Sequence, residues 1–152
     1  MPEKRTLDRA RADKKAGKAA STQAGEFIRE QVDHIRAGRH GARSAKQAIA
    51  IGLSEARRAG VNLPPPKSGK TSTQTRTKAK RDVARGQGSP RRSATSPKRS
   101  KASENALKRE SIAAASPRAL SRQARSAAAR RSPGERSAAA RKAARTRHLH
   151  GA

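Results

Sequence analysis

The stretch RSAKQAIAIGLSEARRAG, residues 43–60, carries the start and stop signals of one complete α-helix. Ser44 and the glutamine three residues after it form a capping box, because each side chain can bind a backbone N–H at the helix start. Gly60 can adopt the left-handed conformation that ends a helix, and Val61 can contact the last turn as in a Schellman motif. Together these signals predict a helix over residues 45–59.

One face of this predicted helix carries mostly small side chains, among them Ala48, Gly52 and Ala56, so a second helix could approach it closely. The preceding segment, residues 22–37, has larger apolar residues at spacings of three and four, which is typical of an amphipathic helix. We therefore expect a helical hairpin across the turn 39–43. Its packing face would comprise Phe27, Ile28, Val32, Ile35, Ile49 and Leu53.

The starts of the two earlier helices are assigned from their capping residues. A short, mostly charged helix over residues 6–16 would begin at Thr6, whose hydroxyl can accept a backbone hydrogen bond. The second helix would begin at Ser21 or Thr22, and Gly38 would end it.

Composition divides the chain into unequal parts. The protein has 152 residues, with 38 basic and 11 acidic side chains and a formal net charge of +27. Ten of its 15 Leu, Ile, Val and Phe residues lie in residues 1–63, where the net charge is +7, whereas the remainder carries +20. We therefore expect a mostly α fold, in which a small N-terminal helical hairpin module at 4–63 precedes a long disordered or conditionally helical basic tail.

This tail is expected to have two parts. Three prolines at 64–66 end the ordered module, and residues 64–103 are rich in Pro, Ser, Lys and Arg, which is typical of a disordered linker. Residues 104–147 are rich in Ala and Arg and have good helix propensity. Short isolated helices are marginal in water, so this second part would be helical only conditionally.

The second part of the tail contains two helix-start signals. Ser116 precedes Pro117 and Ser132 precedes Pro133, and a capping serine followed by proline is typical of a first turn. Glu135 completes a second capping box with Ser132. These helices would form once a polyanion neutralises the arginines.

The tail also contains two copies of Ser-Pro followed by two basic residues, at 89–92 and 96–99. Proline restricts the backbone and the serine hydroxyl can close a local turn, so paired cations would project from a compact unit. The copies resemble the Ser-Pro-Lys-Lys repeats of linker-histone tails, which implies binding in a DNA groove; a basic, disordered linker is the alternative interpretation. Nucleic-acid-binding residues predicted from the whole tail are Arg91, Arg92, Lys98, Arg99, Lys101, Arg118, Arg122, Arg125, Arg130, Arg131, Arg136, Arg141, Lys142 and Arg145.

The balance of charged and aromatic residues indicates the kind of nucleic acid. A strongly positive field favours polyanions, and binding to phosphates requires no special geometry. Phe27 is the only aromatic residue, and it lies on an apolar stripe. Because single strands are usually gripped by base stacking, duplex DNA or structured RNA is the expected partner.

Other functional classes have little support in the sequence. No catalytic constellation of acids, bases and nucleophiles is recognisable, so neither an enzyme nor a cofactor is expected. Residues 68–71, SGKT, lack the glycine that a phosphate-binding loop places five residues earlier. The four histidines are too scattered for a metal site and are predicted to be exposed to solvent: His34, His40, His148 and His150.

Location is inferred from what the sequence lacks. No apolar run approaches the length of a membrane span, and the charged N-terminal residues do not resemble a signal peptide. The chain contains no cysteine, which excludes disulfides. A cytoplasmic protein is expected.

Residues 38–66, GRHGARSAKQAIAIGLSEARRAGVNLPPP, resemble the signature of a family of small, basic, histone-like bacterial proteins. This family is an uncharacterised domain of unknown function, and the resemblance extends over roughly residues 3–66. It implies a bacterial source; the expected location at the bacterial nucleoid follows from the DNA-binding hypothesis below.

These observations lead to three hypotheses. The first is a nucleoid-associated, histone-like protein that binds duplex DNA with little sequence preference. A structured-RNA or ribosome-associated binding protein is the second. The third is an adaptor whose N-terminal helices bind a protein partner while the tail only localises it. Under the first hypothesis the same helices would provide self-association or a partner contact.

Overall fold

The computed structural model describes residues 1–88 and 96–150, and this part of the chain contains seven α-helices, one 3-10 helix and no strand. The predicted mostly α class is confirmed. The elements are α1 (Lys4–Lys15), α2 (Ala20–Arg36), α3 (Ala45–Arg58), α4 (Thr73–Gly86), α5 (Pro97–Lys108), η1 (Ile112–Ala115), α6 (Pro117–Ala129) and α7 (Pro133–His150).

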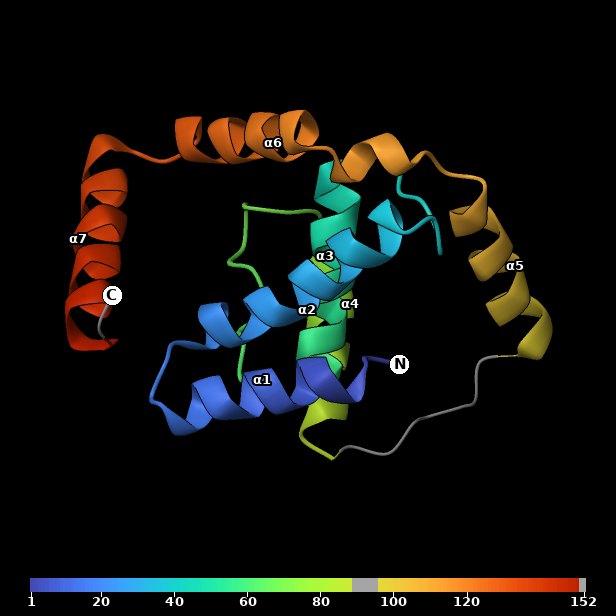
Figure 1. The fold of residues 1–152 in the computed structure, drawn as a ribbon, viewed down its shortest axis with the longest axis horizontal. Coiled ribbons are helices and arrows are strands. Elements are labelled where there is room, and N and C mark those ends of the chain that lie inside the picture. The colour runs from blue at the N-terminus through green and yellow to red at the C-terminus, as the bar shows by residue number, and fades with distance from the viewer. Residues whose placement is uncertain (89–95, 151–152) are drawn as a thin grey trace.

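Helix α3 is the centre of the arrangement. It packs against α2, α4, η1 and α6, whereas α1 packs against α2. Figure 1 shows α3 crossing α2, so the expected hairpin consists of two helices that cross rather than lie side by side.

The predicted signals at both ends of α3 are confirmed. Ser44 Oγ accepts from the Gln47 N–H at 3.3 Å, although the Gln47 side chain accepts from the N–H of Arg43 (2.8 Å) and not from that of Ser44. Gly60 has φ +89°, and the N–H of Val61 binds the carbonyl of the last turn as a Schellman motif requires. The first and last turns of α3 therefore depend on local contacts.

The small-residue face of α3 packs as predicted. Ala48 and Ala56 are fully buried, and between them the backbone of α2 approaches Gly52 directly. A Cβ atom at Gly52 would lie 2.7 Å from the Cα atom of Ile28, closer than side chains tolerate. Glycine is therefore required where the two helices cross.

The core consists of two clusters on either side of this crossing. In the first, Phe27 packs with residues from α1 and from the end of α3. In the second, Val32 and Ile35 pack with Ala48 and with residues of η1. Of the predicted packing face, Phe27, Val32 and Ile35 are buried and Ile28, Ile49 and Leu53 are half-buried.

Two helix starts differ from the prediction. Helix α1 begins at Lys4 with Glu3 as its cap, and Thr6 is a buried residue of its first turn. Helix α2 begins at Ala20, because the carbonyl of Ala19 accepts the first two backbone hydrogen bonds. The Gln23 side chain donates to the Lys18 carbonyl before the helix at 2.9 Å, so a local amide contact takes the place of the expected hydroxyl cap.

The prediction of a disordered linker at 64–103 is not supported, because α4 lies within it and packs against α3. The Ser54 hydroxyl donates to Asp82 Oδ2 at 2.6 Å, and Ala79 is buried nearby in α4. A Cβ atom at Gly86 would lie 1.9 Å from the carbonyl oxygen of Arg57. Composition missed this contact because it depends on small residues and one buried carboxylate, not on large apolar side chains.

The tail at 104–147 is likewise not detached from the module. Ala114 and Ala115 of η1 are buried in the same cluster as Ile35, and Arg36 Nε donates to the Ala115 carbonyl at 3.1 Å. The backbone N–H of Gly41 binds the carbonyl of Leu107 at 2.8 Å. The tail thus contributes two buried alanines and backbone hydrogen bonds to the core of the module. A count of large apolar residues could not predict this contribution.

The later helices begin as predicted. Ser116 Oγ caps α6, and Pro117 follows as the first residue of the helix. Ser132 and Glu135 form a reciprocal capping box at the start of α7. In the described part of the chain, α5 and α7 pack extensively on no other element. None of the helices described is both long enough and apolar enough to span a lipid bilayer.

Candidate nucleic-acid interface and a carboxylate–histidine cluster

The half-buried residues and the arginines of helix α6 lie on different faces of the helix. Ala119, Leu120 and Gln123 are the half-buried side that faces the rest of the molecule. Arg118, Arg122 and Arg125 follow at spacings of four and three and are all exposed. These three residues, called here the α6 arginine face, project from a helix that η1 and α3 hold in place.

Beside this face lies a groove of ≈ 470 Å³ between α6 and the first turn of α3. Arg122 from α6 meets Arg43 and Lys46 there, and these are the charged residues among its lining side chains. Ser44, which caps α3, also lines the groove, so backbone N–H groups of the helix start are nearby. This combination suits an anion such as a phosphate.

The remaining predicted nucleic-acid-binding residues lie along the chain rather than in one site. Lys98, Arg99 and Lys101 are exposed on α5. Arg130 and Arg131 lie between α6 and α7 and are exposed as well. Arg136, Arg141, Lys142 and Arg145 are exposed on α7. Arg91 and Arg92, with the first Ser-Pro copy, lie outside the described residues.

The second Ser-Pro copy does not form a separate turn. Ser96 caps α5, with Pro97 in its first turn, and its hydroxyl accepts from the N–H of Arg99 at 3.3 Å. The predicted hydrogen bond from a backbone amide to the serine is present, but it begins a helix. Lys98 and Arg99 are therefore held on the first turn of α5.

Sequence reasoning missed the basic residues of the groove that come from the N-terminal module, Arg43 and Lys46. A signal was available, because both flank the cap of α3, where a helix attracts anions. Their meeting with Arg122 could not be read from the sequence, since it depends on η1 packing against α2.

Several basic side chains in and after α1 differ from those of α6 because they have acidic partners. Arg9 lies 3.7 Å from Glu26, and Lys18 lies 2.8 Å from Asp13. Within residues 1–88 and 96–150, by contrast, the α6 arginine face has no ion pair within 4.0 Å. Positive charge available to a polyanion is thus concentrated toward the second half of the chain.

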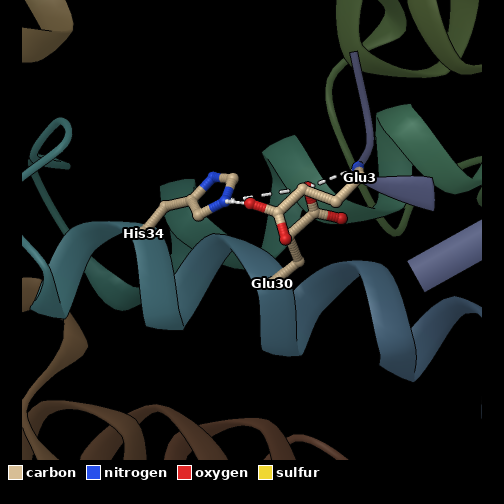
Figure 2. A group of neighbouring side chains, drawn as sticks. All are labelled: Glu3, Glu30 and His34. Atoms are coloured by element: carbon tan, nitrogen blue, oxygen red, sulfur yellow. Dashed lines mark hydrogen bonds and ion pairs between the residues drawn. The ribbon is translucent and has the colours of Figure 1, made fainter. Parts of the chain in front are cut away.

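A different kind of site lies between the start of the chain and α2. Figure 2 shows Glu3, which precedes α1, facing Glu30 and His34, which stand one turn apart on α2. His34 Nε2 lies 3.0 Å from Glu3 Oε1 and 3.8 Å from Glu30 Oε1. Glu30 Oε1 also accepts from the Glu3 backbone N–H at 2.9 Å. We call these three residues the carboxylate–histidine cluster.

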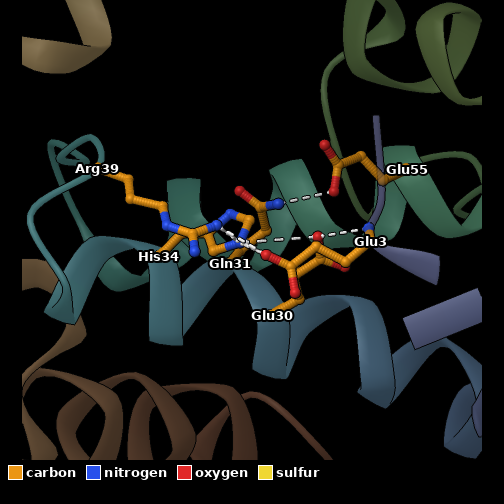
Figure 3. Close-up of polar contacts among 6 residues, drawn as sticks. All are labelled: Glu3, Glu30, Gln31, His34, Arg39 and Glu55. Atoms are coloured by element: carbon orange, nitrogen blue, oxygen red, sulfur yellow. Dashed lines mark hydrogen bonds and ion pairs between the residues drawn. The ribbon is translucent and has the colours of Figure 1, made fainter. Parts of the chain in front are cut away.

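Arg39 contacts this cluster from the turn after α2 (Figure 3). Its Nη1 atom lies 2.7 Å from Glu3 Oε1 and 2.9 Å from His34 Nε2. Hydrogen bonds donated by His34 and Arg39 lower the pKa of the Glu3 carboxyl below its ordinary value. Glu3 is therefore ionised at neutral pH.

The cluster corrects the prediction that the histidines are simply exposed. The side chain of His34 is 18% exposed, and the ring of His40 packs edge-on against it with centroids 6.2 Å apart. Sequence spacing excluded a metal site because it considered histidines alone. The structure adds two carboxylates, and one ligand atom from each of the three cluster residues lies within 4.8 Å of the others.

A further acidic residue, Glu55 of α3, lies near the cluster. Gln31 Nε2 donates to Glu55 Oε2 at 2.7 Å (Figure 3). Burial raises the pKa of the Glu55 carboxyl above its ordinary value of 4.5, and the charge of Glu30 adds to this shift. Folding thus disfavours the ionised form of Glu55 relative to the unfolded chain.

Glu55→Gln is expected to stabilise the protein at neutral pH. Because the folded state binds the Glu55 proton more tightly than the unfolded chain, stability falls as pH rises from 4.5 toward the raised value. Glutamine keeps an acceptor for Gln31 and removes the titration. Thermal unfolding should give a higher Tm for the variant at pH 7 and equal Tm values near pH 4; a lower Tm at pH 7 would contradict this reasoning.

Comparison with known proteins identifies one segment of the chain. Residues 11–68 match the family described as "Family of unknown function (DUF6496)". A domain of unknown function therefore covers the end of α1, α2 and α3, and its boundary falls before α4. No curated protein and no solved structure matches the chain.

Proposed function

We propose that this protein is a histone-like, nucleoid-associated protein that binds duplex DNA through its phosphates with little sequence preference. The observation that carries this proposal is the α6 arginine face beside the groove of Arg43, Lys46 and Arg122. In the described structure the lining of this groove contains no acidic residue. Cations held in this way bind phosphates with release of counterions. The proposal includes a location at the bacterial nucleoid.

The surroundings of α3 support low sequence preference. A recognition helix needs an exposed face with side chains that can read base edges in the major groove. Helix α3 instead packs against α2, α4, η1 and α6. A helix-turn-helix arrangement of α2 and α3 would therefore lack an accessible reading face.

The packing of η1 favours DNA binding over the adaptor hypothesis. That hypothesis assigned a partner to the apolar surface of the N-terminal helices. Ala114 and Ala115 of the same chain pack against Ile35 and Ala48 of this surface. An internal segment thus occupies much of the position that a partner would take.

The test is a binding series with duplex DNA, structured RNA of equal length and inorganic polyphosphate over a range of salt concentrations. Replacing Arg118, Arg122 and Arg125 by glutamine is expected to lower duplex affinity about 30-fold and to reduce the salt slope by up to about 2.7, near 0.9 for each lost phosphate contact. Fluorescence anisotropy at several salt concentrations measures both quantities.

A matched control removes the same charge elsewhere. Arg9, Arg11 and Lys18 have acidic partners, so their replacement by glutamine should change duplex affinity by less than about threefold. Equal losses in both triple variants would mean that net charge alone drives binding. Tighter binding of structured RNA than of duplex would favour the second hypothesis, an RNA-binding protein.

A further inference from the structure

We infer that the carboxylate–histidine cluster of Glu3, Glu30 and His34 binds a divalent transition-metal ion of the Zn²⁺ type. This site is separate from the basic surfaces that the proposed function uses. Nothing in the DNA-binding proposal requires it, and its test is independent of nucleic acid.

Ligand geometry is the first argument. Two ligands about 2.0–2.2 Å from one tetrahedral ion lie roughly 3.4 Å apart. In the cluster, His34 Nε2 lies 3.0 Å from Glu3 Oε1 and 3.8 Å from Glu30 Oε1. Small side-chain rotations would therefore bring an imidazole nitrogen and two carboxylate oxygens around one ion. Three protein ligands leave a fourth position for water.

Burial of Glu30 is the second, independent argument. Its side chain is only 4% exposed, and among the described residues its Oε2 atom has no hydrogen-bond partner. A buried carboxylate oxygen without a partner is unfavourable unless a cation compensates it. A cavity of ≈ 160 Å³ lies beside this carboxylate and leaves room for an ion and its water. Its charged lining residues include, besides the cluster, Glu26 and Asp33 and the arginines at positions 5, 9, 29 and 39.

The contacts of Arg39 are the third argument. A single nitrogen, His34 Nε2, lies within hydrogen-bond distance of both the Glu3 carboxylate and the Arg39 guanidinium. This nitrogen cannot donate to the carboxylate and accept from the guanidinium at the same time. An ion would take the nitrogen lone pair, and Arg39, whose side chain is 60% exposed, could turn into solvent.

The donor set indicates which ions would bind. Imidazole suits Zn²⁺ and its first-row neighbours, whereas Mg²⁺ and Ca²⁺ prefer oxygen ligands alone. Two carboxylates balance the charge of a divalent ion without help from Arg39. We therefore expect Zn²⁺ and Co²⁺ to bind and Mg²⁺ to have little effect.

The experiment titrates the untagged full-length protein with Zn²⁺ against a chromophoric chelator, and with Co²⁺ by its visible absorption. Glu30→Gln and His34→Ala are expected to weaken Zn²⁺ binding at least about 100-fold, because loss of outer-shell partners alone costs 10- to 100-fold. Arg39→Gln should tighten binding about fivefold, since it removes a competing cation. Circular dichroism confirms that each variant is folded.

A histidine on the protein surface outside the cluster provides the control for Zn²⁺ binding. His148 is exposed on α7, far along the chain from the cluster, and His148→Ala should leave Zn²⁺ affinity unchanged. Equal Zn²⁺ affinity in the unmodified protein, Glu30→Gln and Arg39→Gln would overturn the proposal. Because Arg39→Gln is expected to gain affinity, a positive result cannot arise from misfolding.

Discussion

Removal of α7 is expected to lower duplex DNA affinity about 1,000-fold while leaving the fold intact. A chain ending at residue 131 loses five cations of α7, so the salt slope should fall by up to about 4.5. Helix α7 packs extensively on no other described element, so Tm should change by less than about 2 °C. Anisotropy in a salt series and thermal unfolding measure the two effects separately.

Variants of the full-length protein can show whether the positive charge of α7 is responsible for its contribution to duplex binding. Replacing the five cations of α7 by glutamine should reproduce the loss of affinity. Replacing its arginines by lysine, which keeps every charge, should keep the salt slope. Should the glutamine variant bind duplex as tightly as the unmodified chain, α7 would not contact phosphates, and binding would depend on the α6 arginine face and its groove.

Gly52→Ala is expected to destabilise the protein by about 2 kcal/mol and to lower Tm by roughly 4–8 °C. The added Cβ atom would lie 2.7 Å from Ile28 Cα and 2.8 Å from Ile28 N, both backbone atoms that no rotamer change can move. Helices α2 and α3 would have to separate, which also loosens the contacts of Ala48 and Ala56. This cost exceeds the gain of about 1 kcal/mol that alanine brings inside a helix.

Gly25→Ala is the matched control, because Gly25 lies inside α2 and a Cβ atom there meets nothing within 4 Å. This variant should be more stable by about 0.5–1 kcal/mol. Chemical denaturation of both variants gives the comparison. Opposite signs are expected; stabilisation by both substitutions would show that the helices cross less closely than described.

Local signals predicted those parts of the fold that depend on contacts within one turn. The capping serines at 44, 116 and 132 and the glycine after α3 form the expected hydrogen bonds. Each such bond joins residues three to five positions apart. The small-residue face of α3 was also predictable, since the 3.6-residue period places its members on one side.

The candidate sites were predictable only in part. The arginines of α6 were predicted as binding residues, and their helix places them on one exposed face. Arg43 and Lys46 line the same groove as Arg122 only because η1 packs against α2 and α3, and the sequence did not indicate this packing. Glu3 reaches Glu30 and His34 because α1 packs on α2, a contact that neither residue type nor spacing indicates.

By itself, the sequence determined the helical class, the bounds of α3, its small-residue face and the excess of positive charge. These properties follow from backbone capping, helical periodicity and composition. Tertiary structure decided that α4 and η1 belong to the core and that two carboxylates surround His34. The reason is physical: alanine, glycine and single carboxylates contribute little until another segment approaches them, and that approach depends on the arrangement of the whole chain.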